Sequence, residues 1–531
     1  MKKGLNIVSI AAVALALASC GPDYLNQEPQ GSTITQNQYD QKEDATAGSV
    51  RGIYTRLYAV SDHDVFGQRS IDMYGDMLCG DMAMKTRNYG WFSSDELMQT
   101  SSGRRSYIWS YYYNIIRLCN KTINALDKQG RPKLDVTVAN LTEAELNNGF
   151  YFAEVLAIRG WAYAGLLRYF VSPYADITDI YSELAVPIYD ESVTLKDDTL
   201  GAPRSTVADV YDRLESDLQD AIDYFDTYSV IERSNKIEIN IDVARAILAY
   251  AYLNKGDNTN ALKYAKAVID NTSAALLPNS QVLTTGFNNV DNNDWLWGKK
   301  VTVDNYGALA SFFGQCDIYS YSYASAGDVK GIDANLYKQI QDLSWDIREG
   351  WFNNYYDAKA SNYTYYQYAP DGKFYSATSK KLQGDRDWLS DDVYMRLELA
   401  YLIAAEAACR LTDDETAKSY LFEITDRRVK DEAGAATTYE NWKTALTVHD
   451  DIMQAIRYNW RVELWGEGYG LQTFRRFGET VALGENHLRS TKNISPTMPS
   501  ARYFTFELPT AEYYYNPFIR STTELAQAPQ R

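Results

Sequence analysis

The chain has 531 residues, with 52 Lys and Arg against 70 Asp and Glu, which gives a formal net charge of −18. A surface this acidic repels phosphate backbones, so we expect no nucleic-acid partner. Only three histidines occur, none of them four residues from another, and no GxSxG or phosphate-loop pattern is present. These counts leave little for metal chemistry or histidine-based catalysis, and we predict neither a cofactor nor a metal.

Tyrosine is the most unusual feature of the composition, with 44 residues beside 11 Trp and 17 Phe. Its ring offers a flat apolar face and a hydroxyl group on a side chain that loses little entropy on binding. Most individual tyrosines belong to the border of a core, but the excess favours a protein that binds a ligand.

The N-terminus predicts export and lipid attachment. Two lysines follow Met1, an apolar run of 12 residues spans positions 7–18, and Leu17-Ala18-Ser19 leads to Cys20. The run is too short to cross a bilayer, which needs roughly 20 residues, so residues 1–19 are predicted to be a signal peptide. Cysteine at the cleavage site indicates acylation of Cys20, and acyl chains anchor at about 0.8 kcal/mol per buried methylene. The alternative is an ordinary secretory peptide that contains a cysteine.

Residues 20–40 are rich in Gln, Ser and Thr, which suits a tether between the lipid and a single domain over residues 41–531. Apolar residues spaced by three and four predict helices from about Ala45 and over 107–126, 147–170 and 207–224. The segment Pro203-Arg204-Ser205-Thr206 supplies the start signal for the last of these. Four further cysteines form no CxxC pair, and we expect them to be mostly buried and free.

Two later segments have the same pattern of small residues. Ala249 and Ala261 lie 12 residues apart across a polar turn that contains Gly256, and Ala405 and Ala417 repeat this spacing. That is the helix–turn–helix spacing of tetratricopeptide repeats, in which alanine lets paired helices approach closely. Residues from about 275 to 390 break the helical pattern with clusters of Tyr, Trp, Asn, Asp, Gly and Ser. We therefore predict a mostly α fold in which tetratricopeptide-like helix pairs support a loop-rich insertion.

Eight sequence blocks, in order along the chain, resemble the SusD/RagB family of outer-membrane nutrient-binding lipoproteins. They are Cys20-x2-Asp23-Tyr24-Leu25-Asn26-x2-Pro29, Trp109-x3-Tyr113-x2-Ile116-x3-Asn120, Glu154-x4-Arg159-Gly160 with Tyr163, Pro203 to Val207 with Tyr211 and Asp217-Leu218, Tyr401-Leu402-Ile403-x2-Glu406-Ala407, Arg461-x-Glu463-Leu464-x2-Glu467-Gly468, Phe474 to Gly478, and Leu508-Pro509 with Glu512 and Asn516-Pro517. The resemblance implies a SusD-like fold that is lipid-anchored at the outer membrane and faces the cell exterior. It also implies a partner, a SusC-type TonB-dependent porin, to which captured oligosaccharide is delivered. One departure is that only Asp23 supplies an acidic group near Cys20, where the family signal for surface display is expected.

The resemblance further implies that sugar binds to a loop after the first helix and to the middle insertion. The first loop, residues 80–92, could stack a sugar on Tyr89 and Trp91 and bond its hydroxyls through three polar residues. Those three are Asp81, Arg87 and Asn88. Two glycines, Gly80 and Gly90, fit a tight loop. Alternatively, Trp91 and Phe92 only seal the loop against the frame.

The second loop contains Asn305 and Tyr306, which resemble a stacking-tyrosine segment of starch-binding members, and a run with tyrosine at 319, 321 and 323. In an extended segment, alternation would put Tyr319, Tyr321 and Tyr323 on one face. That face would be either a binding stripe or one side of a packed hairpin.

The charged residues of the helices are predicted to be structural rather than catalytic. We expect Glu154, Arg159, Glu406, Arg461 and Glu463 to form buried or capping ion pairs. A glycoside hydrolase would need two carboxylates at a defined separation, and no motif selects two here, so we predict no enzyme. A tetratricopeptide scaffold that binds proteins, or a family member that binds peptide, is the alternative, although a scaffold leaves the tyrosine-rich insertion unexplained.

Overall fold

The computed structural model describes residues 45–97, 103–171, 183–192, 201–231, 235–353, 367–375, 389–478, 482–490 and 505–519. The predicted signal peptide, Cys20 and the tether lie outside these residues. The helices are α4 (Ala45–Leu57), α5 (Gln68–Cys79), α6 (Ser94–Leu97), α7 (Arg104–Gly130), α8 (Glu143–Phe170), α9 (Val207–Thr227), α10 (Ile241–Lys255), α11 (Asn258–Asn271), α12 (Phe312–Cys316), α13 (Ala334–Asp342), α14 (Leu397–Arg410), α15 (Asp414–Thr425), α16 (Ala435–Ala445), α17 (His449–Glu463), α18 (Gly470–Phe477) and α21 (Thr510–Tyr515). The fold is thus mostly α, as predicted.

In the described part of the chain, strands form three short antiparallel pairs. They are β1 (Met82–Met84) with β5 (Lys330–Ile332), β2 (Leu184–Pro187) with β3 (Arg204–Thr206), and β4 (Trp295–Lys299) with β6 (Asp392–Arg396). Two of them, β1–β5 and β4–β6, join segments that are distant in the sequence. The pairing of β1 with β5 brings the first predicted loop to the insertion. Among the described residues, no helix is long and apolar enough to cross a membrane.

Local sequence signals explain where the long helices begin. Thr206 caps α9 by accepting a hydrogen bond from the backbone of Asp209 at 3.1 Å, and the Asp209 carboxylate accepts the Thr206 N–H at 2.9 Å. Thr142 and Glu145 form the same reciprocal cap on α8. These capping boxes satisfy backbone donors that the first turn of a helix leaves unpaired, and the predicted start of α9 is confirmed.

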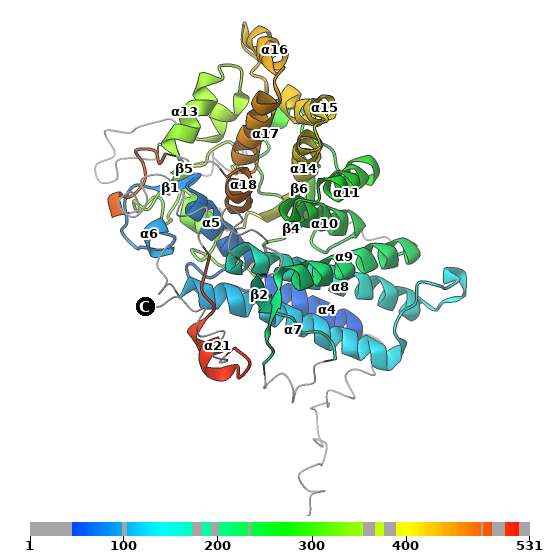
Figure 1. The fold of residues 1–531 in the computed structure, drawn as a ribbon. Helices are drawn as coiled ribbons and strands as arrows, with labels where there is room; N and C mark the ends of the chain where they lie inside the picture. The colour runs from blue at the N-terminus through cyan, green and yellow to red at the C-terminus, as the bar shows by residue number, and fades with distance from the viewer. Residues whose placement is uncertain are drawn as a thin grey trace, which may run out of the picture.

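Consecutive helices pack side by side in an array that we call the helical frame, made of α4, α7 to α11, α14, α15 and α17 (Figure 1). Neighbouring helices of the array approach one another closely. A Cβ atom at Gly160 of α8 would lie 2.8 Å from Leu218 Cγ of α9, so only glycine fits this crossing without a shift. The alanines predicted to pack the two helix pairs, Ala249, Ala261, Ala405 and Ala417, are all 0% exposed.

The two helix pairs, α10–α11 and α14–α15, share one turn geometry. Asp257 N–H bonds the Tyr252 carbonyl at 2.9 Å, and Asp413 N–H bonds the Ala408 carbonyl at 3.0 Å, five residues back in both cases. Each of these aspartates then caps the following helix. The predicted tetratricopeptide-like pairs are therefore confirmed.

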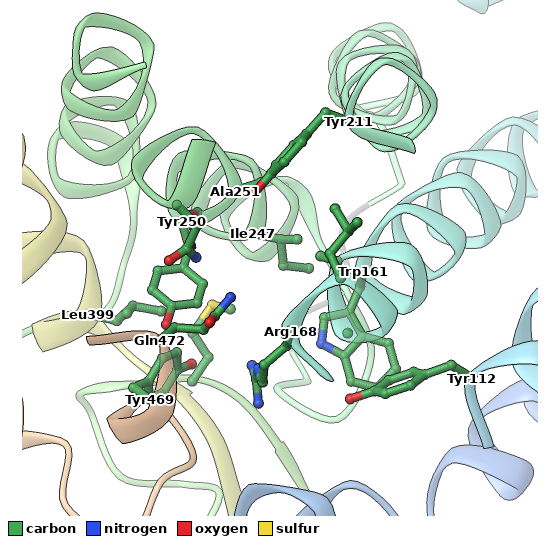
Figure 2. Close-up of a pocket in the computed structure, with 15 residues that line it drawn as sticks. Tyr112, Trp161, Arg168, Tyr211, Ile247, Tyr250, Ala251, Leu399, Tyr469 and Gln472 are labelled. Carbon is green, nitrogen blue, oxygen red and sulfur yellow. Dashed lines mark hydrogen bonds between the residues drawn. The ribbon is translucent and has the colours of Figure 1, made fainter. Parts of the chain in front are cut away.

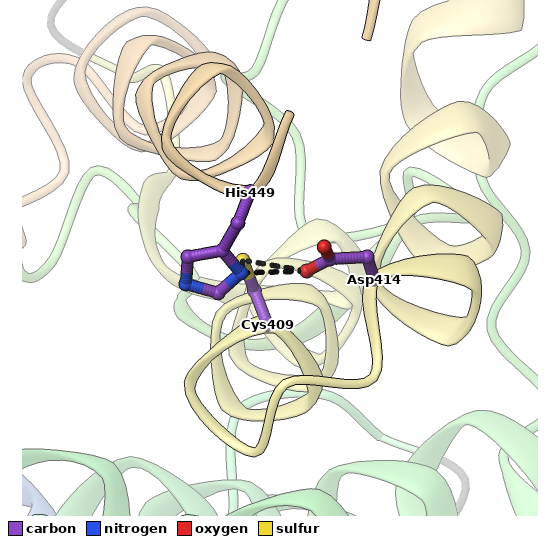
Figure 3. A group of neighbouring side chains, drawn as sticks. All are labelled: Cys409, Asp414 and His449. Carbon is purple, nitrogen blue, oxygen red and sulfur yellow. Dashed lines mark hydrogen bonds and ion pairs between the residues drawn. The ribbon is translucent and has the colours of Figure 1, made fainter. Parts of the chain in front are cut away.

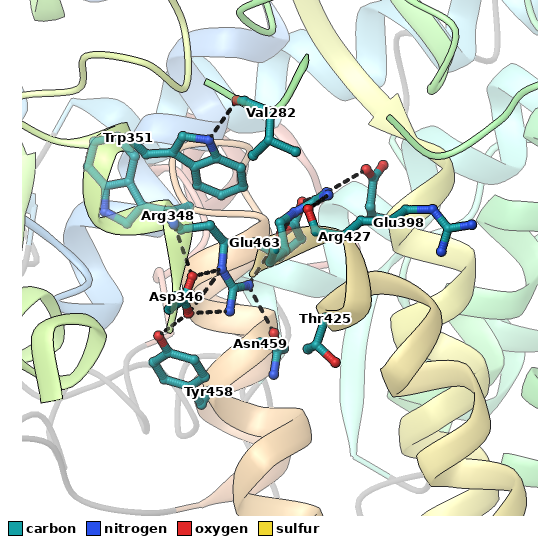
Figure 4. Close-up of polar contacts among 12 residues, drawn as sticks. Val282, Asp346, Arg348, Trp351, Glu398, Thr425, Arg427, Tyr458, Asn459 and Glu463 are labelled. Atoms are coloured by element: carbon teal, nitrogen blue, oxygen red, sulfur yellow. Dashed lines mark hydrogen bonds and ion pairs between the residues drawn. The ribbon is translucent and has the colours of Figure 1, made fainter. Parts of the chain in front are cut away.

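A network of buried charges lies where the frame meets the insertion (Figure 4). Glu463 is fully buried and its carboxylate receives Arg428 at 2.8 Å, Arg348 at 3.2 Å and Arg396 at 3.4 Å. Burial alone would raise the pKa of Glu463, but the three guanidinium groups outweigh it and hold that pKa well below its usual range.

The helix charges that the sequence indicated as structural are buried and paired. Arg159 bonds Asp217 at 2.8 Å, Glu406 bonds Arg476 at 3.0 Å, and Glu154 accepts the Tyr54 hydroxyl at 3.0 Å. The side chains of the two ion pairs are at most 5% exposed, and Glu154 and Tyr54 are buried as well. These contacts hold helices together, and the structural interpretation is confirmed.

Candidate functional site

The loop after α5 leaves β1 and turns at Gly90, whose φ of 83° favours glycine. Phe92 follows and is 2% exposed, with its ring 5.1 Å from that of Tyr74 and 5.8 Å from that of Phe66. Phe92 therefore anchors the loop to the frame, as the alternative interpretation expected for it. Trp91, one residue earlier, is only half-buried and lies on the outer side of this anchor.

Four aromatic side chains form a cluster that we call the aromatic face: His63, Tyr89, Trp91 and Tyr323. The rings of Tyr89 and Trp91 stack with centroids 5.4 Å apart and planes 7° apart, and His63 stacks on Trp91 at 4.9 Å. Tyr323 meets Trp91 edge-on at 4.6 Å and donates or accepts a 2.7 Å hydrogen bond with His63 Nδ1. Tyr89 remains 49% exposed, so the cluster presents a ring face to solvent.

The side chain of Asp328 holds the loop that carries Tyr89 in place. Its side chain is 0% exposed, and its carboxylate accepts the backbone N–H groups of Asn88 and Tyr89, the latter at 2.8 Å. The Asn88 side chain also donates to the Ala326 carbonyl at 2.8 Å, and Thr86 bonds the Gly327 carbonyl. We call this set of bonds the Asp328 clamp. It holds together two loops that lie about 240 positions apart in the sequence.

The segment around Tyr306 belongs to the same side of the molecule. Tyr306 is 43% exposed, and a Cβ at its neighbour Gly307 would lie 3.1 Å from Val60, three residues before His63. Asn305 is exposed, but its side chain closes its own turn, because Oδ1 accepts the Thr302 N–H at 2.8 Å and Nδ2 donates to the Lys300 carbonyl at 3.0 Å. Tyr306 thus keeps an exposed surface, whereas the amide of Asn305 shapes the turn.

The expectation of a flat stripe at 319–323 is wrong, since the segment is a compact series of bends rather than a strand. Asp317 causes the compaction by accepting the Tyr319 N–H at 2.7 Å and the hydroxyl of Ser320. The three tyrosines then point to different places. Tyr319 is half-buried and donates to Asp371 at 2.6 Å, Tyr321 is 61% exposed, and Tyr323 is buried behind Trp91.

Two polar residues of the first loop have different positions. Asp81 is 5% exposed, its carboxylate binds Arg461 of α17 at 2.6 Å, and its carbonyl accepts the Trp465 indole N–H at 2.8 Å. Asp81 therefore fastens the base of the loop and does not face solvent, which corrects the expectation that it bonds ligand hydroxyls. Arg87 is 41% exposed, and its guanidinium lies 3.4 Å from the carboxylate of Glu96, which is 50% exposed.

A cavity inside the helical frame offers a different kind of site (Figure 2). Tyr112, Trp161, Arg168, Tyr250 and Tyr469 are among the residues that line it, and its volume is about 60 Å³. Ligand pockets usually have several hundred cubic ångströms, whereas about 10–15 Å³ suffices for one water molecule. The cavity therefore suits a few waters, and an oligosaccharide fits the open aromatic face better.

Sequence reasoning missed His63 as a member of the face and Asp328 as its support. His63 lies outside both predicted loops, and Asp328 lies in no motif. Of the residues at this site, only the exposed aromatic residues of the loops were indicated by the sequence, through the excess of tyrosine.

Known proteins share this architecture and parts of this sequence. Residues 249–526, just over half of the chain, match the model described as the SusD family, and residues 23–253 match one described as "Starch-binding associating with outer membrane". A curated SusD-like protein of Bacteroides ovatus is 26% identical over 294 residues, which are 53% of this chain and 47% of the relative. The match thus spans about half the length of that relative.

Solved structures match over nearly the whole described fold. A SusD superfamily protein from Bacteroides thetaiotaomicron has a TM-score of 0.72 at 21% identity, covering 90% of this chain and 98% of that one. A SusD-like carbohydrate binding protein from Bacteroides vulgatus has a TM-score of 0.71 at 22% identity, covering 90% and 97%. The helix pairs, the loop-rich insertion and the family match agree, and the chain belongs to the SusD family.

Proposed function

We infer that this protein is a glycan-binding lipoprotein of the outer membrane, which captures oligosaccharide on the aromatic face and passes it to a SusC-type TonB-dependent porin. The observation that carries the proposal is the exposed Tyr89–Trp91 stack, held in place by buried groups on both sides. One model that the chain matches is described as starch-binding, and one structural neighbour as carbohydrate binding.

The chemistry of the face suits a sugar ring. A pyranose has an apolar C–H surface that packs on an aromatic ring, and its rim carries hydroxyl groups that need donors and acceptors. Tyr89 and Trp91 supply the ring surface, while Arg87 and Asn88 border it with exposed polar groups. Tyr306 and Tyr321, both exposed, extend the aromatic surface toward further residues of an oligosaccharide.

Attachment to the membrane is assigned to Cys20, which follows the predicted signal peptide. The description "associating with outer membrane" of the matched model supports this location. Replacing Cys20 with Ala should release the protein from the membrane fraction and abolish its exposure on the cell surface. A Cys20→Ala variant that still sediments with membranes would contradict the assignment.

A polysaccharide-retardation gel tests ligand binding, and an assay for new reducing ends in the same samples tests for hydrolysis. We expect retardation by the cognate glycan and no release of reducing ends. Calorimetric titration with an oligosaccharide from the retarding glycan then compares the natural chain with Tyr89→Ala. Loss of one stacking surface should weaken binding by roughly 1–3 kcal/mol, by analogy with base stacking on aromatic side chains.

The matched control is Tyr515→Ala, which removes a tyrosine that is 82% exposed on α21, a helix that belongs to neither loop. Equal affinity of Tyr89→Ala and the natural chain would remove the site from the aromatic face. Retention of a peptide, and of no glycan, would instead favour the peptide-binding alternative.

A further inference from the structure

Three potential metal ligands meet at the turn between α14 and α15, next to the start of α17 (Figure 3). Cys409 lies in the last turn of α14, Asp414 is the first residue of α15, and His449 is the first residue of α17. The Cys409 Sγ atom lies 3.7 Å from both Asp414 Oδ1 and His449 Nδ1, and these two atoms are 2.7 Å apart. We propose that Cys409, Asp414 and His449 bind one Zn²⁺ ion.

The distances fit the edges of a zinc coordination polyhedron. Zinc binds cysteine sulfur at about 2.3 Å, histidine nitrogen at about 2.0 Å and carboxylate oxygen at about 2.1 Å, with tetrahedral angles. The resulting separations are about 3.5 Å for pairs that include sulfur and about 3.3 Å for nitrogen with oxygen. The two sulfur distances already match. The shorter contact between Asp414 and His449 must widen by about 0.6 Å to reach the tetrahedral edge.

The exposure of the three side chains also suits a metal site with one open position. Cys409 is buried, whereas the side chains of Asp414 and His449 are 31% and 41% exposed. A metal ion would therefore have its sulfur ligand on the protein side and a solvent molecule on the other. Cysteine binds zinc as the thiolate, so coordination would displace the proton of the Cys409 thiol.

The surrounding charge favours a cation. Four exposed acidic residues adjoin the ligands in sequence, namely Asp413, Glu415, Asp450 and Asp451. Arg410, the basic residue beside Cys409, is directed toward Glu406 at 2.8 Å, and Lys418 pairs with Glu415 at 2.7 Å. The mixed sulfur, nitrogen and oxygen donor set selects zinc over calcium and magnesium, which take oxygen ligands.

The first helix pair shows that the turn does not need these donors. Leu253 and Asn258 occupy the positions of α10–α11 that correspond to Cys409 and Asp414, yet the turn has the same hydrogen bonds. The thiol and carboxylate are therefore specific to the second pair, where α17 brings a histidine to them. A bound ion would join the ends of α14, α15 and α17.

Cobalt substitution tests the proposal on the full chain, because Co²⁺ bound to a thiolate gives a charge-transfer band and tetrahedral Co²⁺ gives strong visible absorption. We expect both at one Co²⁺ per chain, with bleaching when Zn²⁺ is added. Zinc should also raise the melting temperature of the chelator-treated protein. Cys409→Ser should abolish the charge-transfer band, and Cys316→Ala, at a buried cysteine elsewhere, should keep it.

His449→Gln provides a second variant that cannot fail by unfolding the core, since the histidine is partly exposed. Loss of a direct ligand should weaken zinc binding at least as much as the roughly 10–100-fold effect of removing an outer-shell partner. The proposal is overturned if one equivalent of Co²⁺ gives no band, if Cys409→Ser keeps the band, or if His449→Gln binds zinc with unchanged affinity. In those cases the Asp414–His449 contact is a hydrogen bond between helices and nothing more.

Discussion

In the helical frame, buried carboxylates such as those of Glu463 and Glu406 face arginine side chains, and each charge is neutralised by another charge. Around the aromatic face, the buried carboxylates of Asp328 and Asp317 accept hydrogen bonds from backbone N–H and hydroxyl groups of irregular loops. The first arrangement joins helices whose backbone N–H and C=O groups are already paired within each helix. The second gives a fixed shape to loops that have no regular backbone pairing, which leaves the aromatic rings free to face solvent.

The strongest test of this difference removes one charge from the frame. Glu463→Gln leaves Arg348, Arg396 and Arg428 without their shared partner, and losing one member of a buried ion pair costs roughly 3–5 kcal/mol of unfolding free energy. Urea denaturation at neutral pH measures this loss. Because the folded pKa of Glu463 is lowered, its contribution is present above its unfolded value near pH 4. The difference between variant and natural chain should therefore shrink as the pH falls below about 4.

Asp342→Asn serves as the surface control, because Asp342 of α13 pairs with Lys338 where both side chains are more than 60% exposed. An exposed pair of this kind is worth at most about 0.5 kcal/mol on a helix. Equal losses in Glu463→Gln and Asp342→Asn would show that the buried network contributes no more than a surface pair.

The corresponding change on the other side of the comparison is Asp328→Asn. The N–H groups of Asn88 and Tyr89 bond different oxygens of the carboxylate, and an amide replaces one of these oxygens with an NH2 group that cannot accept. A lost hydrogen bond to a charged group costs about 1.5–3 kcal/mol. Glycan affinity should fall along with stability, because Asn88 and Tyr89 lose their fixed positions. Calorimetry and melting curves check both effects, and Asp304→Asn, at an exposed position of the insertion, is the control. A variant that melts earlier but binds glycan normally would separate the clamp from the site.

A third change tests whether every acid of the buried network around Glu463 is charged, since Asp294 joins that network through Arg396. Burial, with the charge of Glu398 adding to it, raises the pKa of Asp294 to about 8, and its Oδ1 atom has no hydrogen-bond partner. A raised folded pKa gives a stability contribution that is full below the unfolded value near pH 4 and is lost as the pH rises to about 8. Between pH 5 and pH 8 the natural chain should therefore lose up to about 1.4 kcal/mol per pH unit through this group. Asp294→Asn should show a flatter profile, and parallel profiles would mean that Asp294 is ionised throughout.

The smallest effect is expected at the turns of the two helix pairs, α10–α11 and α14–α15, which have different residues at one position. Thr412 has a φ of 61°, whereas the corresponding Gly256 has a φ of 88°, and a β-branched residue is strained in this region. Thr412→Gly should raise the free energy of unfolding by up to about 1 kcal/mol, after the entropy cost of glycine is subtracted. Gly256→Thr, where no atom lies within 4 Å of the new Cβ, should lower it. Thermal denaturation of both variants would detect changes of this size.

Local signals predicted the frame well. The cap at Thr206, the 12-residue spacing from Ala249 to Ala261 and its repeat from Ala405 to Ala417 each act over one or two helical turns, so they can be recognised in the sequence. The structural role of Glu406 and Arg461 followed from their place on packed helices. The boundaries of the single domain and of its insertion stay predictions.

The site was less predictable because its geometry depends on contacts between distant segments. The exposure of Tyr89, Tyr306 and Tyr321 agrees with a role in stacking, which stays a prediction. Asp81 has the same loop context as Arg87, and only the position of Arg461, 380 residues later, decides that its carboxylate is buried. The prediction of a stripe at 319–323 was wrong for a local reason. The alternating tyrosines suggested an extended segment, but Asp317 bends it.

The Asp328 clamp has a consequence for how new specificities can arise or be engineered in this protein. The loop at 85–92 and the loop at 320–328 share one buried acceptor, the Asp328 carboxylate. A new loop at 320–328 must supply an acid at the same place, and a new loop at 85–92 must have the same backbone path, because the donors are backbone N–H groups. Transplanting a foreign loop should therefore succeed only when both segments are moved as a matched pair. A change of ligand specificity would then require both loops to change together, although they are encoded far apart in the gene.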